Sequence, residues 1–225
     1  MYEHDGIRYY KIYLGTAYAS LEARSYDASK IPLHLTIPET INGYPITSIN
    51  HGAFSGAKLK TIDIPDTVWY IGKNAFRTCN DLTHVNFYES SNIKLKKFIK
   101  LCSRAFLGCN SLKEICSEVK FAKIGTQCFS DCINLQHIQA PIVELQGLAL
   151  ENCSSLKSIL LEDNCVIASS ALKGCKTLTD LMFLGNISNA VADSMLKIIK
   201  KKTIWCTADS NLAEFAYFGT DIRIN

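Results

Sequence analysis

Cysteine is the residue type in this 225-residue chain whose spacing first suggests chemistry. The sequence contains 10 cysteines and writes Ala-Phe-x-x-Cys-x-x-Leu twice, within 74–82 (NAFRTCNDL) and 104–112 (RAFLGCNSL). Cysteines can ligate a metal, close a disulfide or act as nucleophiles. The five that share this slot are Cys79, Cys109, Cys132, Cys153 and Cys175. Because the chain has no C-x₂-C pair and five members cannot pair evenly, we interpret them as small buried apolar side chains.

A second group with chemical potential consists of His84, Glu114, Cys116 and His137. If they lie on neighbouring strands, Glu114 and one histidine can share a metal across about 4.8 Å, but the two histidines lie twice as far apart. A Cys116–His137 pair would also need an orienting group and an oxyanion hole. The chain has no nucleophile elbow, phosphate loop or H-E-x-x-H motif. We therefore expect no catalytic residue, metal or cofactor, and we expect Cys116 to be the most reactive thiol.

The elements that position these residues follow from an internal repeat. The motif recurs at 52–59, 74–82, 104–112, 127–135, 148–156 and 170–178, with its leucines spaced by 23, 30, 23, 21 and 22 residues. A degenerate seventh copy includes Met195 and Ile204, and HLTIPETI (34–41) supplies a leading half-repeat. A unit of about 22 residues cannot bury its own apolar face, so the copies must stack into a solenoid.

Each repeat predicts two short strands and a turn. Period-two alternation after the leucine predicts a strand with these inward pairs: Ile62/Ile64, Val85/Phe87, Ile115/Ser117, Ile138/Ala140, Ile159/Leu161 and Leu181/Phe183. A second inward set precedes Ala-Phe: Ile46/Ile49, Val68/Ile71, Phe98/Leu101, Phe121/Ile124 and Ile142/Leu145. We expect the Ala-Phe segment to form a short helical or 3₁₀ stretch.

The alternate strand positions predict an exposed sheet face, the natural binding surface of a solenoid. Its candidate binding residues are Thr61, Asp63, His84, Asn86, Glu114, Cys116, His137 and Gln139. Leu160 and Met182 make the C-terminal part of this face apolar.

The ends of the array need caps, because an open coil exposes apolar surface and strand edges. We predict one structural domain in three parts: a β-hairpin cap at 1–30 that turns near Gly15, a solenoid at 31–206, and a cap at 207–225. The C-terminal cap is expected to continue from a strand through a helix, near 211–218, to a last strand.

The repeat resembles the BspA-like leucine-rich repeats, whose units run approximately L-x-x-I-x-I-P-x-x-V-x-x-I-G-x-x-A-F-x-x-C. The best copy is LKTIDIPDTVWYIGKNAFRTC, from Leu59 to Cys79, and the resemblance covers about 30–206. It implies a leucine-rich-repeat solenoid, α/β to mostly β, of about six to seven repeats of about 22–23 residues with stacked parallel short strands. It also implies a cell-surface or secreted protein that acts in adhesion or host–protein contact.

An insertion at about 88–97 lengthens one repeat from 23 to 30 residues. Insertions in solenoids form loops that are often used for binding. Lys94, Lys96 and Lys97 make this segment a candidate site for an anionic or acidic partner.

The bulk composition narrows the function class. The net charge of +3 and the lack of an aromatic platform argue against nucleic acid, and no apolar run is long enough for a membrane span. We expect a monomeric, non-enzymatic module that binds a host or cell-surface protein. One alternative is a cytoplasmic interaction scaffold, favoured by many unpaired cysteines and the lack of a signal peptide at Met1. The other is a metal- or thiol-dependent enzyme that uses His84, Glu114, Cys116 and His137.

Overall fold

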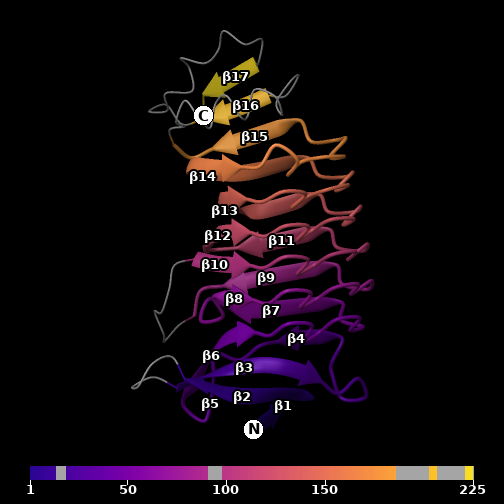
Figure 1. Cartoon of the computed structure of the whole chain (residues 1–225), viewed down its shortest axis with the longest axis vertical. Helices are drawn as coiled ribbons and strands as arrows, with labels where there is room; N and C mark the ends of the chain where they lie inside the picture. Colours follow the sequence, from indigo (N-terminus) through magenta and orange to yellow (C-terminus); the bar gives the residue numbers. More distant parts are fainter. Residues whose placement is uncertain (14–18, 91–97, 186–202, 207–220, 225) are drawn as a thin grey trace.

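The computed structural model describes residues 1–13, 19–90, 98–185, 203–206 and 221–224, which form a β-solenoid of about seven turns (Figure 1). The N-terminal strands are β1 (Tyr2–His4), β2 (Ile7–Tyr13), β3 (Ala19–Tyr26), β4 (His34–Thr36), β5 (Thr40–Ile41) and β6 (Tyr44–Ile49). The central ones are β7 (Thr61–Pro65), β8 (Tyr70–Ile71), β9 (His84–Tyr88), β10 (Phe98–Leu101), β11 (Glu114–Ser117) and β12 (Lys120–Ile124). The last are β13 (His137–Leu145), β14 (Ser158–Ile167), β15 (Asp180–Phe183), β16 (Thr203–Cys206) and β17 (Asp221–Ile224).

Three rows of backbone run along the solenoid. The first sheet is the parallel series β4, β7, β9, β11, β13, β14, β15, β16 and β17. The second sheet is the parallel series β3, β6, β8, β10 and β12, followed by the C-terminal parts of β13 and β14. The Ala-Phe segments form the third, which we call the turn row. The expected mostly β solenoid with stacked parallel strands is therefore confirmed.

The core lies between the three rows. The inward residues of the first sheet are buried as predicted except Ser117, which is partly exposed. In the second sheet the inward assignment of Phe98 is wrong, because its side chain is 45% exposed whereas Ile99 is 1% exposed. A register shift between Ile99 and Lys100 lets Ile99 pair with Phe121 while Leu101 still pairs with Ile124. Because the insertion before β10 changes the length of this repeat, the one-residue shift could not be predicted from the spacing of the repeats.

The expected helical or 3₁₀ conformation of the Ala-Phe segments is also wrong, since no helix occurs among the described residues. The backbone N–H groups of these segments alternate between an acceptor in the next coil and an acceptor in their own turn. Phe76 N donates to Ala105 O of the next coil at 2.7 Å, and Arg77 N donates to Asn74 O of its own turn at 3.1 Å. A helix would keep all of these donors within one segment. Left-handed residues four positions apart, such as Asn74 (φ 58°) and Thr78 (φ 55°), produce this alternation.

Two ladders of side chains fill the space behind the turn row. The rings of Phe54, Phe76, Phe106 and Phe129 stack with centroid separations of 5.2, 5.0 and 5.2 Å. Tyr26 extends the stack at 5.9 Å from Phe54. Stacked aromatic pairs contribute about 0.5–1.5 kcal/mol beyond the area that they bury.

The cysteines form the second ladder, which confirms the packing interpretation. The five repeat cysteines are buried, and the nine cysteines whose side chains are described are thiols. Each Sγ of the ladder donates a hydrogen bond to a carbonyl of the preceding coil at 3.0–3.1 Å; the acceptors are Phe54, Phe76, Phe106, Phe129 and Leu150. Burial raises the pKa of Cys132 and Cys153, so that these thiols keep the proton that they donate.

The described parts of the ends show how the solenoid is covered. At the N-terminal end, β1 pairs antiparallel with β2, β2 with β3, and β3 then joins β6 of the second sheet. At the other end, β16 and β17 continue the first sheet in parallel. The expected turn at Gly15 and helix near 211–218 lie outside the described residues, and the boundaries at 30 and 206 stay predictions.

Candidate functional site

The outer face of the first sheet brings the predicted binding residues into two straight columns, which we call the polar face. In one column, Thr61 pairs with His84, His84 with Glu114, and Glu114 with His137. In the other column, which comprises Asp63, Asn86, Cys116 and Gln139, the residues pair in the same order. His84, Asn86 and Gln139 are exposed and the other five are partly exposed. The structure thus places all eight residues on one surface.

Hydrogen bonds across strands hold several of these side chains. Asn86 Nδ2 donates to Asp63 Oδ1 at 3.1 Å, and Gln139 Nε2 donates to Glu114 Oε1. Thr36 Oγ1, one strand earlier, donates to Asp63 Oδ2 at 3.4 Å. Such cross-strand pairs reduce the rotamer freedom that a partner would otherwise have to restrict. The polar face is therefore partly ordered before it binds anything.

The metal and thiol chemistry weighed for this face finds no support in the geometry. No group of three or more His, Cys, Asp or Glu side chains arranged to hold a metal occurs in the described part of the chain. His137 stands beside Glu114 in one column, whereas Cys116 pairs with Asn86 and Gln139 in the other. The residues of the supposed constellation are neighbours in a sheet, with no shared centre.

Cys116 is a weaker nucleophile than the sequence suggested. Its side chain is only partly exposed, and burial, the negative charge of Glu114 and a hydrogen bond with that carboxylate raise the pKa of the Cys116 thiol. Because the thiolate is the reactive form, a higher pKa leaves less of it at neutral pH. These features argue against a readily reacting Cys116, and its reactivity relative to the other thiols stays a prediction.

The basic insertion is described only at its start, residues 88–90. Lys94, Lys96 and Lys97 lie outside the described residues, so their role stays a prediction. The entry to the segment is fixed by Ser90, which is buried and donates its backbone N–H to Asp66 Oδ1 at 3.0 Å. Glu89 N donates to Glu118 Oε2 at 3.0 Å. The insertion thus starts from a firmly held point beside β9.

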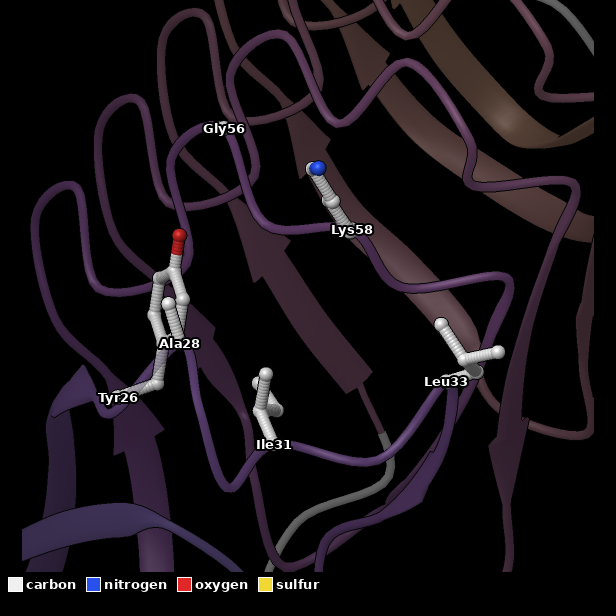
Figure 2. A pocket seen from close by; sticks show the side chains of 6 residues that line it. All are labelled: Tyr26, Ala28, Ile31, Leu33, Gly56 and Lys58. Atoms are coloured by element: carbon white, nitrogen blue, oxygen red, sulfur yellow. The ribbon is translucent and has the colours of Figure 1, made fainter.

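Two hollows of about 310 Å³ each were missed by sequence reasoning. Figure 2 shows the first, an apolar hollow near the N-terminal cap lined by Tyr26, Ala28, Ile31, Leu33, Gly56 and Lys58. The second, which we call the basic hollow, opens on the second sheet and is lined by Tyr70, Lys73, Lys100, Leu101, Cys102, Ser103, Lys123, Gly125 and Gln146. The signal for it was a lysine at equivalent positions of two neighbouring repeats, Lys100 and Lys123, which pair in the second sheet. Lys73 lies three residues after Tyr70, the residue that pairs with Lys100. The long insertion obscured this correspondence.

Solved structures of leucine-rich-repeat proteins resemble this chain. The Treponema pallidum leucine-rich-repeat protein has a TM-score of 0.60 at 19% identity, over 89% of this chain and 97% of that one. A leucine-rich cell surface protein from Faecalibacterium prausnitzii has a TM-score of 0.52 at 17% identity, over 94% of this chain and 73% of that one. A leucine-rich-repeat protein from Eubacterium ventriosum has a TM-score of 0.52 at 26% identity, over 70% of this chain and 48% of that one.

No curated protein matches the sequence. Among the residues that the structure describes, no helix is long and apolar enough to cross a membrane. The family model of the BspA type leucine rich repeat region matches six copies over residues 10–102 and 89–198. Because this match covers most of the chain, the chain belongs to the BspA-type leucine-rich-repeat family.

Proposed function

We propose that this protein is a non-enzymatic module that binds a protein partner through the polar face. The observation that carries this proposal is the in-register array of hydrogen-bonding side chains on three successive strands, β9, β11 and β13. A stacked parallel sheet offers a rigid surface, so little conformational entropy is lost on binding. Leucine-rich-repeat solenoids are commonly used for such contacts, which supports the proposal at the level of fold.

We further propose that the partner is an extracellular or host protein and that the chain acts at a cell surface in adhesion. The structural neighbour from Faecalibacterium prausnitzii is described as a cell surface protein, and that description supports this location. The thiol state of the nine described cysteines favours a second candidate, an intracellular interaction scaffold, because unpaired thiols are typical of reducing compartments.

A binding panel with a matched control tests the polar face. Immobilised extracellular matrix proteins are presented to the wild type, to the Asn86→Ala/Glu114→Ala/Gln139→Ala variant, and to Arg77→Ala. Arg77 is an exposed residue of the turn row and serves as the control. We expect the wild type and the control to bind one matrix protein equally and the triple variant to bind it at least about tenfold more weakly. Equal binding by all three would contradict the proposed face.

The location is tested separately on intact cells that express the chain. Surface proteolysis followed by immunoblotting should remove the protein from unpermeabilised cells if it acts outside. Full protection under conditions that cleave a known surface protein would favour the intracellular scaffold. The binding panel and this assay are independent, so a wrong location would not by itself remove the proposed binding face.

A further inference from the structure

The second sheet carries a column of charged side chains that the polar face does not use. On its outer face Ser48 pairs with Tyr70, Tyr70 with Lys100, and Lys100 with Lys123. Lys123 Nζ lies 3.1 Å from Glu144 Oε1, at the next coil. Two ammonium groups thus follow one another on neighbouring strands, and Lys73 adds a third at the edge of the turn row.

The basic hollow lies between these side chains, and its shape depends on a glycine. Gly125 has no side chain, and a Cβ at this position would come within 2.7 Å of the Cys102 carbonyl carbon and the Ser103 nitrogen. The absence of that atom lets the Gly125 backbone pack closely against the preceding coil at the edge of the hollow. A volume of about 310 Å³ is at the lower end of ligand sites in proteins, which suits a single small group.

The charged side chains that line the hollow all carry positive charge. No carboxylate lines it among the described residues. Only Lys123 of its three lysines is neutralised by a nearby acid, Glu144, since neither Lys73 nor Lys100 forms an ion pair within the described ranges. Lys100 Nζ lies 5.8 Å from the centre of the Tyr70 ring, a cation–π contact that leaves its N–H groups available to a ligand.

Neutral hydrogen-bond donors surround the same space. Tyr70, Ser103 and Gln146 line it with a phenol, a hydroxyl and an amide. A hydrogen bond with Cys102, partial burial and nearby negative charge raise the pKa of Tyr70, so its phenol stays protonated at neutral pH. The donors come from four successive coils and are therefore spread along the axis of the solenoid.

This donor set distinguishes between classes of anion. A planar carboxylate is best matched by the fork of an arginine, and none of the described residues that line the hollow is an arginine. Lysine is a compact point charge that suits phosphate, whose oxygens point in several directions and accept several separate donors. We propose that the basic hollow binds a tetrahedral oxyanion, a phosphate or sulfate ester group, through Lys73 and Lys100 with Tyr70 and Ser103 as hydrogen-bonding neighbours.

An NMR titration of the ¹⁵N-labelled full chain tests this site. Sodium phosphate, sodium sulfate and sodium acetate are added at equal, low ionic strength, and the amide shifts of 100–103 and 123–125 are followed. We expect phosphate and sulfate to shift these amides in a saturable way. Acetate should bind several-fold more weakly, because it offers two coplanar oxygens. Saturation by acetate at the same concentration would overturn the tetrahedral assignment.

Variants that each remove one lysine charge identify the lysines that bind the anion. Lys73→Gln and Lys100→Gln should each weaken binding about threefold and together about tenfold, as expected for solvated ion pairs. Lys58→Gln, which removes the same charge from the hollow in Figure 2, should leave the affinity unchanged. Equal weakening by Lys58→Gln would mean that binding reflects net charge alone.

A third variant separates the hollow from the insertion that precedes β10. Lys94→Gln/Lys96→Gln/Lys97→Gln should keep the saturable shifts at 100–103. If this variant abolishes binding while Lys73→Gln/Lys100→Gln retains it, the proposed site is wrong. Because the polar face is untouched in all these variants, the outcome is independent of the proposed protein-binding function.

Discussion

Each cysteine of the ladder works as a small apolar side chain that also donates a hydrogen bond. Its Sγ reaches a carbonyl of the preceding coil that points into the core, as Cys109 reaches Phe76 O at 3.1 Å. An alanine of the same size class stands at this slot in the first coil, Ala57, where it is also buried. The slot therefore needs a small residue, and the thiol adds a modest hydrogen bond.

This reading predicts unequal costs for two neighbouring core substitutions. Cys109→Ala removes one sulfur and one donor and should lower the free energy of unfolding by about 1–2 kcal/mol. Phe106→Ala removes a ring that stacks on both Phe76 and Phe129 and should cost about 3–5 kcal/mol. Urea denaturation followed by circular dichroism measures both. A cost for Cys109→Ala as large as that for Phe106→Ala would mean that the thiol has a role beyond packing.

A second prediction concerns the pH dependence of Cys116 alkylation. Burial and then the negative charge of the Glu114 carboxylate raise the pKa of Cys116, so alkylation by iodoacetamide should be slow at pH 7 and accelerate only above the ordinary thiol pKa of about 8.5. Glu114→Gln removes the negative charge and should lower this pKa, so that alkylation at pH 7–8 becomes faster. Mass spectrometry of the Cys116 peptide gives the rates. Unchanged rates in Glu114→Gln would show that burial alone governs the thiol.

At the scale of elements, period-two alternation identified the strands of the first sheet and the eight residues of its polar face. That inference works because a one-residue slip would turn every apolar side chain outward. It failed at β10, where the insertion removes the fixed spacing on which it depended, and Phe98 was assigned to the core in place of Ile99. The same alternation could not predict the conformation of the turn row. Every second hydrogen bond there joins residues of different coils, and local sequence does not record such bonds.

The corrected register of β10 predicts that two adjacent substitutions differ strongly in their effect on the free energy of unfolding. Ile99→Ala should lower the free energy of unfolding by about 2–5 kcal/mol, because Ile99 is buried in the core. Phe98→Ala should change it by less than about 1 kcal/mol, since this ring is 45% exposed. Both are measured by urea denaturation of otherwise identical chains. The reverse order would restore the original assignment of Phe98 to the core.

The turn row offers a stabilising substitution. Thr78 has a φ of 55°, a left-handed conformation that is unfavourable for a β-branched residue, and glycine fills the equivalent position at Gly56 and Gly108. Thr78→Gly should relieve about 1 kcal/mol of strain and raise the melting temperature. Asn80→Gly is the control: this exposed residue of the same segment is absent from the positive-φ positions, so glycine there should lower the melting temperature. Destabilisation by both would mean that the strain at Thr78 is negligible.

At the scale of the whole molecule, the solenoid is held together by contacts between adjacent coils. Parallel strand pairs, turn-row hydrogen bonds and the two ladders all join one coil to the next (Figure 1). In such a quasi-one-dimensional array, stability is approximately a sum of coil and interface terms. A local defect is then expected to loosen its neighbours more than distant coils.

Tyr26 is the residue through which the N-terminal cap meets the Phe ladder, and it tests this nearest-neighbour picture. Its ring stacks on Phe54 at 5.9 Å, and its Oη donates to Ser55 O at 3.4 Å. Tyr26→Ala should uncover Phe54 and raise the hydrogen-exchange rates of amides at 52–57 by about tenfold or more. Exchange at the distant turn 149–153 should change little. Hydrogen exchange with mass spectrometry resolves both segments, with the exposed Lys73→Ala as a control that leaves both unchanged. A uniform acceleration along the chain would instead show that all coils open as one cooperative unit, and the nearest-neighbour picture would be wrong.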